Sequence, residues 1–492
     1  MPDDIAVAAE RELDPSRDRS ARAAVGLAQH GIPGLREQAA PSEGARYGRM
    51  FDLDQDELDA NELDPDTLEA LADAMIARPG TFDPNPRIPA GYTYFGQLVD
   101  HDLTFDPTST LGLRNDPETL FDFRTPRFDL DSLYGSGPMD QAFLYDWSPQ
   151  GHRGVDLLVG RNPEGREFTA RDLPRNQQGR ALIGDARNDE NLVTSQLHLL
   201  FIRFHNRVVE HVLDGDRHIS SPALFEKAQR LVRWHYQWIV KHDFLPRIVG
   251  EELANAKPVH FTWKPGEGPF MPVEFSVGAY RFGHSMVRND YKLNDARPNV
   301  PILEPRSPFG PTLAGFRRLP AGLDIEWKHF FPLDKATVAQ RSMRIDPSLS
   351  GQLAALPPDA ASLPFLNLRR ANALGLPNGF QAADAMRLHR LDDDDLLAPL
   401  PEDVDDRVKH AVVERPPLWY YVLCEASAHA DGFRLGQTGG RIVAEVINGL
   451  LEADPNSYVN ADPPWTPELD RADDATFTMA DLVRFTLGPT RG

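Results

Sequence analysis

The chain has 492 residues, 41% of them hydrophobic and 26% charged, which is a globular composition with room for one large domain or several smaller ones. Its 52 Lys and Arg against 74 Asp and Glu give a formal net charge of −22. A surface this acidic repels phosphate backbones and anionic lipid, so nucleic acid is not expected as a partner. Cys424 is the only cysteine, which excludes an intrachain disulfide.

The N-terminal region carries no targeting signal that we recognise. Met1 to Ala6 has acids where a secretory signal has cations, and no apolar core follows. No apolar run reaches the length of a membrane span. We therefore expect a cytoplasmic protein, with leaderless secretion left open. Residues 1–45 show little apolar periodicity and predict a partly extended or disordered arm, and residues 46–492 predict one large domain.

The stretch from Tyr94 to Leu103 predicts an apolar helix with an unusual number of polar groups. Gln97 and His101 are four residues apart and share a helix face, while Asp100 and Asp102 point to either side. Taken alone, the segment is most simply a core histidine between two solvent-facing acids. It also suits a pocket in which an imidazole works above a buried cofactor.

A second polar segment, Gly184 to Asn191, carries Arg187 and, three residues later, Glu190. By itself this is typical of an exposed ion pair. A helix is predicted directly after it, from Thr194, because apolar residues recur at three and four positions. Another helix is predicted from Ser221-Pro222, a capping residue followed by a proline in the first turn.

Two further segments place polar side chains in apolar surroundings. In Ala279 to Ser285, His284 follows a glycine that would let a bulky planar group approach closely. A core histidine and a haem ligand are both compatible with this pattern. Phe365 to Arg370 carries an amide and two guanidinium groups.

The remaining pattern predicts a mainly α protein with one core and little β structure. Helices are predicted over Pro417–Ala426 and Gly440–Leu451, and the 43 prolines fall mostly between apolar blocks, which favours long irregular loops. The acidic run 392–395 is interpreted as a solvated loop or helix start, not a cation site. His205 and His211 are interpreted as structural because their spacing is poor for sharing a metal.

In this order, the four polar segments resemble those of the peroxidase-cyclooxygenase superfamily, the animal-type haem peroxidases, in its bacterial branch. The resemblance runs from about Tyr92 to Leu451. It implies a single large, mainly α haem-peroxidase domain over residues 46–492, with haem b as cofactor. The implied activity is the reduction of hydrogen peroxide through a ferryl intermediate.

The resemblance assigns roles on both sides of the haem. His101 would be the distal acid–base residue, Gln97 would bind distal water or halide, and Arg187 would be the distal arginine. An imidazole with a pKa near neutrality can move the proton between the peroxide oxygens, and a fixed cation stabilises the departing oxygen. His284 would bind the iron.

Further residues match positions that hold the haem in relatives. Asn367 would bind the other ring nitrogen of the proximal histidine, and Arg281 and Arg370 would pair with haem propionates. Asp100 and Glu190 match carboxylates that form haem esters in vertebrate members. Where some members have a methionine that adds a sulfonium link, this chain has Asn191. That difference favours donors easier to oxidise than chloride: bromide, iodide, thiocyanate or phenols.

The family also holds a calcium ion beside the distal helix. The resemblance makes Asp102 one ligand and takes the others from the loop that follows Phe123, namely Thr125, Arg127, Asp129 and Asp131. All would bind through hard oxygen atoms, as Ca²⁺ prefers.

Two other functions stay open on the same fold. Fatty-acid dioxygenases need a tyrosine three residues before the proximal histidine, and Arg281 stands there. Tyr280 is one residue further away, which on an α-helix rotates the side chain by about 100°. The third possibility is a haem-binding scaffold without turnover. The sequence indicates no oligomeric state.

Overall fold

The computed structural model describes residues 46–488 except 79, 81–82, 106–116, 118–119, 121, 123, 150, 161–171, 265–266, 304–309, 357–360 and 473–475. The predicted N-terminal arm, residues 1–45, lies outside the described residues. None of the described helices is long and apolar enough to cross a bilayer.

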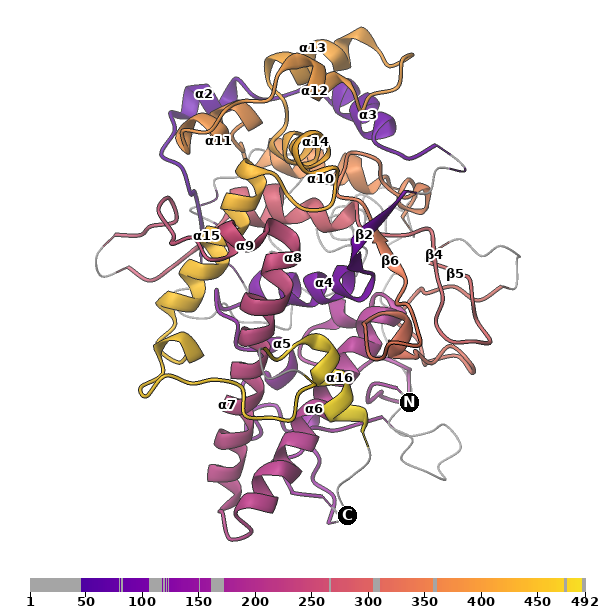
Figure 1. Cartoon of the computed structure of the whole chain (residues 1–492), viewed down its shortest axis with the longest axis vertical. Helices are drawn as coiled ribbons and strands as arrows, with labels where there is room; N and C mark the ends of the chain where they lie inside the picture. The colour runs from indigo at the N-terminus through magenta and orange to yellow at the C-terminus, as the bar shows by residue number, and fades with distance from the viewer. Residues whose placement is uncertain are drawn as a thin grey trace, which may run out of the picture.

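Helices are the main regular structure of the described chain, as the sequence predicts (Figure 1). The α-helices are α2 (Gln55–Asp59), α3 (Pro65–Ala74), α4 (Gly91–Leu103), α5 (Asp131–Tyr134), α6 (Leu192–Gly215), α7 (Ser221–Ile239), α8 (Leu245–Val249), α9 (Glu251–Ala254), α10 (Leu363–Ala373), α11 (Gly379–Ala385), α12 (Asp393–Leu397), α13 (Asp406–Glu414), α14 (Leu418–Ala430), α15 (Gln437–Ala453) and α16 (Met479–Leu487). The short 3₁₀ and π helices are η3 (Ala142–Leu144), η4 (Ala186–Asp189), η5 (Val240–Phe244), η6 (Glu274–Gly278), η7 (Ala279–His284), η8 (Trp327–His329), η9 (Gly351–Leu353) and η10 (Tyr458–Asn460).

The β structure in the described residues consists of three two-stranded pairs. β1 (Tyr47–Gly48) pairs in parallel with β3 (Met271–Pro272), whereas β2 (Pro84–Pro89) with β6 (Arg341–Met343) and β4 (Asp290–Tyr291) with β5 (Val300–Pro301) are antiparallel. Long irregular segments connect the helices, which confirms a mainly α fold with little β structure.

The helices predicted from apolar periodicity are present with slightly different ends. α6 begins at Leu192 because the side chain of Asn191 accepts a hydrogen bond from the Val193 N–H and caps it. α7 begins at Ser221 with Pro222 in its first turn. The acidic run is a helix start, since Asp392 caps α12 through the Asp395 N–H.

α4 lies near the centre of the molecule, with α10 and α14 on one side and α6 and α7 on the other (Figure 1). Phe95 of α4 stacks on Phe201 of α6 and meets the rings of Tyr236 and Phe244 edge-on. At the start of α4 the Gly91 N–H donates to the Phe330 carbonyl at 3.0 Å. The ring contacts of Phe95 and the hydrogen bond of Gly91 hold α4 in place, and with it the polar residues that the helix carries.

The segment that contains His284 is not an α-helix. A π-helix, η6, leads into the 3₁₀-helix η7, which ends at His284. Because a 3₁₀-helix has three residues per turn, the rotation between Tyr280 and Arg281 is about 120°, not the 100° assumed from the sequence. Of the two histidines interpreted as structural, His205 is buried and bonded through both ring nitrogens, to Tyr134 Oη and the Val155 carbonyl.

Candidate active site

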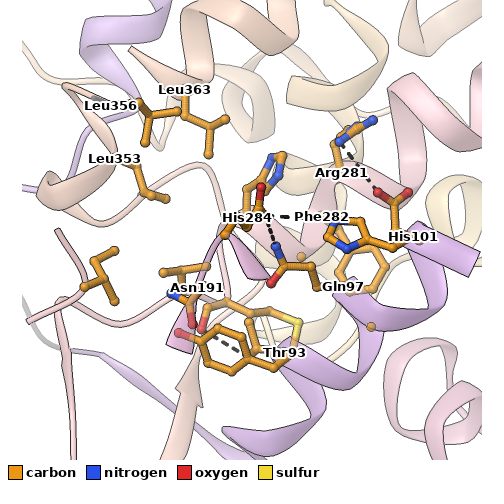
Figure 2. Close-up of a pocket in the computed structure, with 18 of the residues that line it drawn as sticks. Thr93, Gln97, His101, Asn191, Arg281, Phe282, His284, Leu353, Leu356 and Leu363 are labelled. Atoms are coloured by element: carbon orange, nitrogen blue, oxygen red, sulfur yellow. Dashed lines mark hydrogen bonds and ion pairs between the residues drawn. The ribbon is translucent and has the colours of Figure 1, made fainter. Parts of the chain in front are cut away.

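The described residues enclose a cavity of about 460 Å³ between α4, η7 and the loops after η4 and β5. His101 and His284 both line it, although 183 residues separate them in the chain. In Figure 2 their rings approach the cavity from different elements, with Gln97 and Arg281 beside them. The cavity falls in the size range of small-molecule and cofactor sites.

The ring of His101 is oriented by Asn188, which lies in the polar segment Gly184 to Asn191 and has no role assigned from the sequence. His101 Nδ1 lies 2.8 Å from Asn188 Oδ1, and Asn188 Nδ2 lies 3.0 Å from Nδ1 of the buried His198. Since the amide oxygen can only accept, His101 carries its proton on Nδ1 and keeps the lone pair on Nε2. Burial, and next the charge of Arg187, lowers the pKa of His101 to about 4, so the ring is neutral at pH 7.

Arg187 reaches His101 through the backbone. Its guanidinium donates to Asp185 and to the His101 carbonyl at 3.0 Å, and it stacks on the Phe105 ring. Arg187 is buried but is not among the residues that line the cavity. Direct contact between Arg187 and a peroxide, as the resemblance implies, therefore stays a prediction, whereas its effect on His101 follows from the geometry.

Gln97 and Glu190 are joined across the cavity wall. Gln97 Nε2 donates to Glu190 Oε1 at 2.5 Å, and Gln97 Oε1 accepts from Thr194 Oγ1 of α6 at 2.9 Å. The other oxygen of Glu190, Oε2, is buried and has no hydrogen-bond partner among the described residues. Burial raises the pKa of Glu190 to about 8, so this carboxyl is mostly protonated at neutral pH.

On the opposite side, His284 is held by Asn367 of α10. Nδ1 of His284 lies 2.7 Å from the Asn367 side-chain nitrogen, and the roles of the two amide atoms depend on the tautomer of the ring. For a metal to bind through Nε2, Nδ1 must carry the proton and donate to the amide oxygen, so the Asn367 side chain must present Oδ1 to the ring in place of its nitrogen. Burial, and then Arg281, lowers the pKa of His284 to about 3, which keeps the ring neutral and able to ligate.

The carboxylate and guanidinium groups predicted around the haem are only partly brought together. Asp100 and Arg281 line the cavity, with Asp100 Oδ2 3.9 Å from Arg281 Nη1, and Arg281 Nε donates to the Ser276 carbonyl. Arg370 lies in α10 and does not line the cavity. Its predicted propionate contact stays a prediction.

Three carboxylates predicted to bind calcium do meet. Oxygen atoms of Asp102, Asp129 and Asp131 lie within 4.8 Å of one another, and Asp102 Oδ1 is buried without a hydrogen-bond partner among the described residues. Burial, and then the neighbouring acids, raises the pKa of Asp102, and burial raises that of Asp131 to about 6. Thr125 joins the cluster by donating its hydroxyl to Asp129 at 2.8 Å, whereas the carbonyl of Arg127 stays a predicted ligand.

One wall of the cavity is aliphatic. Leu353, Leu356 and Leu363 gather on one side in Figure 2, away from His101, and Ile302 and Val287 also line the cavity. Tyr280 lines it too, and its hydroxyl donates to the Gly96 carbonyl of α4 at 3.3 Å.

The donor set fits a haem. One imidazole is fixed for metal ligation at η7, a second imidazole faces the same cavity from α4, and an orphaned carboxyl oxygen of Glu190 is buried at its edge. A buried polar atom without a partner is costly unless another group completes its contacts, and a bound cofactor would do so.

The comparisons with known proteins agree with this geometry. The chain matches the animal haem peroxidase family over residues 113–454. That stretch is more than half of the chain, so the protein belongs to the animal haem peroxidase family, whose cofactor is haem. The match includes Arg187, Glu190 and His284, while His101 lies just before it.

Individual relatives are distant. A peroxidase-like protein of Margaritifera margaritifera is 25% identical over 248 residues, which is 40% of this chain and 31% of that protein. Human thyroid peroxidase is 27% identical over 224 residues, which is 42% of this chain and 23% of that protein. The matched part thus spans less than a third of the length of these relatives.

Solved structures share the fold. Peroxidase A from Dictyostelium discoideum superimposes with a TM-score of 0.63 at 16% identity and covers 94% of this chain and 95% of its own. A fatty acid alpha-dioxygenase from Arabidopsis thaliana gives a TM-score of 0.57 at 16% identity, over 82% of this chain and 71% of its own. At this identity the likeness establishes the fold alone.

Because Glu190 is protonated in the folded haem-free protein, its carboxyl makes the free energy of unfolding depend on pH. Its pKa of about 8 in the folded state exceeds the ordinary value of 4.5, so the folded protein keeps a proton that the unfolded chain releases. The contribution of this carboxyl to the free energy of unfolding therefore falls as pH rises from about 4.5 to about 8. Glu190→Gln cannot ionise, so we expect it to remove this pH dependence. The free energy of unfolding measured with urea should then differ less between pH 5 and pH 8 in the variant than in the wild type.

Between pH 5 and pH 8, the free energy of unfolding of the wild type should fall by a few kcal/mol more than that of the variant, on the order set by the pKa shift. Glu402→Gln, an exposed glutamate on the surface, is the matched control and should behave as the wild type. Equal pH dependence in Glu190→Gln and the wild type would show that Glu190 is ionised in the folded protein.

Proposed function

We propose that this protein is a haem peroxidase that reduces hydrogen peroxide and oxidises small halide, pseudohalide or phenolic donors. The observation that carries the proposal is the pairing of two oriented imidazoles on one cavity. His101 and His284 each have Nδ1 bound to an asparagine side chain, Asn188 and Asn367 respectively. The amide oxygen of Asn188 places the lone pair of His101 on Nε2, and the Asn367 amide would do the same for His284 with its oxygen turned to Nδ1.

A haem held in this cavity would supply the redox-active iron needed for the two-electron reduction of hydrogen peroxide. His284 would hold it through Nε2, and the Asn367 amide would set the ring orientation. Nε2 of His101, neutral at pH 7, takes the proton from the near oxygen of the peroxide and delivers it to the departing one.

Arg187 supports this proton transfer by position and charge. Its hydrogen bond to the His101 carbonyl fixes the end of α4, and its charge helps to keep the imidazole neutral and ready to accept a proton. Gln97 offers an amide at the cavity wall, where a water molecule or a small anion can bind.

The first test is the replacement of His101. His101→Gln and His101→Ala remove the proton acceptor, so the reaction of the haem-loaded protein with peroxide should slow by about a hundred- to ten-thousandfold. Stopped-flow spectra of the Soret band measure this rate. The Soret band before peroxide should be retained, because His284 still binds the haem.

The exposed histidine variant His410→Ala is the control and should react at the wild-type rate. An unchanged rate in both His101 variants would remove His101 from its role. If the wild type oxidises neither guaiacol nor bromide faster than free haem does, the scaffold without turnover becomes the better interpretation.

We propose further that Asp100 and Glu190 form esters with the haem. Support comes from their place on the cavity wall and from the buried, unpartnered Oε2 of Glu190. Treatment of the haem-loaded wild type with peroxide should make part of the haem resistant to acid–acetone extraction. Glu190→Gln and Asp100→Val should each lower the resistant fraction, as measured by pyridine hemochrome in the pellet. Complete extraction from the treated wild type would contradict the esters.

A calcium ion at Asp102, Asp129 and Asp131 is the third part of the proposal. One buried and two half-buried carboxylates within 4.8 Å repel one another unless a cation lies between them, and hard oxygen ligands select Ca²⁺. Because Asp102 follows His101 directly, the ion would also fix the backbone of the catalytic imidazole.

Chelation should therefore destabilise the protein. In EGTA the Tm should fall by several degrees, and Ca²⁺ at a hundred times its Kd should restore about 2.7 kcal/mol. Asp131→Asn should weaken this response, and the exposed Asp140→Asn should not. Calorimetric scans that give the same Tm with EGTA and with Ca²⁺ would exclude a stabilising ion.

A fatty-acid dioxygenase is the second candidate, because the cavity has an aliphatic wall and Tyr280 lines it. Against it, the Tyr280 hydroxyl is engaged with the Gly96 carbonyl, and Arg281 occupies the position three residues before His284. Oxygen uptake with an unsaturated fatty acid separates the two functions. Uptake that is lost in Tyr280→Phe, without loss of bromide oxidation, would favour the dioxygenase.

A further inference from the structure

A second group of metal-ligand side chains lies outside the haem cavity, beside the start of α4. Asp295 belongs to the turn after β4, whereas Glu326 immediately precedes η8 and His329 ends it. His329 Nε2 is 3.4 Å from Asp295 Oδ1 and 3.4 Å from Glu326 Oε2. Ligand atoms of all three residues lie within 4.8 Å of one another.

The histidine points into this cluster from the interior. His329 is only 5% exposed, and its Nε2 has no hydrogen-bond partner among the described residues. Burial, and then Lys292 and Lys328, lowers the pKa of His329. A buried ring nitrogen that faces two carboxylate oxygens without a hydrogen bond lacks a compensating partner, and a metal cation would provide one.

The distances suit a small divalent ion. In a tetrahedral site with metal–ligand distances of about 2.0–2.1 Å, neighbouring ligand atoms are about 3.3–3.4 Å apart. Both distances from His329 Nε2 have this value. One imidazole and two carboxylates are typical ligands of zinc and related transition metals, whereas Ca²⁺ prefers oxygen atoms alone.

Two lysines share the cluster and balance its charge. Lys292 Nζ is 2.9 Å from Asp295 Oδ1, and Lys328 Nζ is 2.8 Å from Glu326 Oε2. Both ammonium groups are on flexible stems and about a third exposed, so they can turn toward water when a stronger cation arrives. The Asp295 side chain is 69% exposed, which leaves the cluster open to solvent.

We propose that Asp295, Glu326 and His329 form a binding site for a divalent transition-metal ion of the zinc class, with water as the fourth ligand and Lys328 as the competing cation. The site is separate from the haem cavity and from the three-aspartate cluster, and it shares no residue with either.

The metal would connect η8, which lies beside the support of the start of α4, to the turn after β4. The His329 carbonyl accepts from the Gln340 N–H at 2.9 Å, and the Gln340 carbonyl accepts from the Ala90 N–H at 2.8 Å. The next residue after His329, Phe330, accepts from the Gly91 N–H. An ion that ties η8 to the turn after β4 would therefore strengthen the support of the helix that carries His101.

The test measures zinc binding to the haem-loaded protein in millimolar Ca²⁺, which saturates the three-aspartate cluster. Equilibrium dialysis against Zn²⁺, with metal analysis, should give one more zinc per chain in the wild type than in Asp295→Asn at low micromolar zinc. Asp295→Asn changes an exposed side chain, so it should fold, and its zinc affinity should fall at least tenfold. Asp140→Asn, the matched exposed control, should bind as the wild type.

Lys328→Ala provides the opposite change, because it removes the competing ammonium group. Its zinc affinity should rise by about threefold or more, and zinc should raise its Tm by more than that of the wild type. The zinc X-ray absorption spectrum of this variant should include scattering from one imidazole. Equal zinc binding in the wild type and Asp295→Asn, or a spectrum without imidazole, would overturn the proposal and leave the cluster as a set of ion pairs.

Discussion

The candidate active site depends on two hydrogen bonds between a histidine ring and an asparagine amide. Asn188 fixes Nδ1 of His101, and Asn367 fixes Nδ1 of His284. A buried imidazole whose Nδ1 donates to an amide oxygen has a defined tautomer and orientation, with its lone pair on Nε2. Burial lowers the pKa of both rings to about 4 and about 3, so neither one carries a charge at neutral pH.

The short helix α4 carries several of the polar side chains on which the site depends. Gln97, Asp100 and His101 line the cavity, and Asp102 belongs to the three-aspartate cluster. Four such groups on a buried helix would be unfavourable in isolation. They are tolerated because each has a partner on another element, such as Glu190 for Gln97 and Asn188 for His101.

The sequence predicted the positions of the helices better than the hydrogen-bond partners of the site residues. Periodic apolar residues located α6 and α7, and the cap at Asn191 set a boundary that periodicity alone placed two residues later. The 3₁₀ geometry of η7 was not predictable, because it depends on the π-helix before it and on the packing of both against α14 and α15. Asn188 lies within the polar segment Gly184 to Asn191, but only the fold reveals that its amide meets His101.

The hydrogen-bond partners of Arg187 also depend on the fold. A guanidinium near a distal histidine suggests a side chain aimed at the substrate, whereas Asp185 holds it two residues away in sequence and turns it to the His101 carbonyl. The pair Asp295 and His329 was not singled out at all, since 34 residues separate them in the chain. Convergence of side chains from separate loops has no local signature in one sequence.

Asp185 and Glu190, two carboxyl groups near the cavity, differ in charge: Asp185 is ionised and Glu190 is neutral. This difference gives the two groups different roles. Burial works to raise the pKa of Asp185, but the guanidinium groups of Arg187 and Arg124 outweigh burial and hold that pKa well below its ordinary value. Burial raises the pKa of Glu190 to about 8 although it lies only five residues further along the chain. Asp185 thus remains an anion that fixes Arg187, while Glu190 remains a neutral acid at the cavity wall.

The neutral state of Glu190 favours an unprotonated His101 ring. Its Oε1 is 3.9 Å from His101 Nε2, and an ionised carboxylate at that distance would favour a protonated imidazole, which cannot accept a proton from peroxide. The same neutral carboxyl accepts from Gln97 and so leaves the amide fixed at the wall. While it is neutral, the carboxyl that the family resemblance links to haem attachment therefore leaves Nε2 of His101 unprotonated.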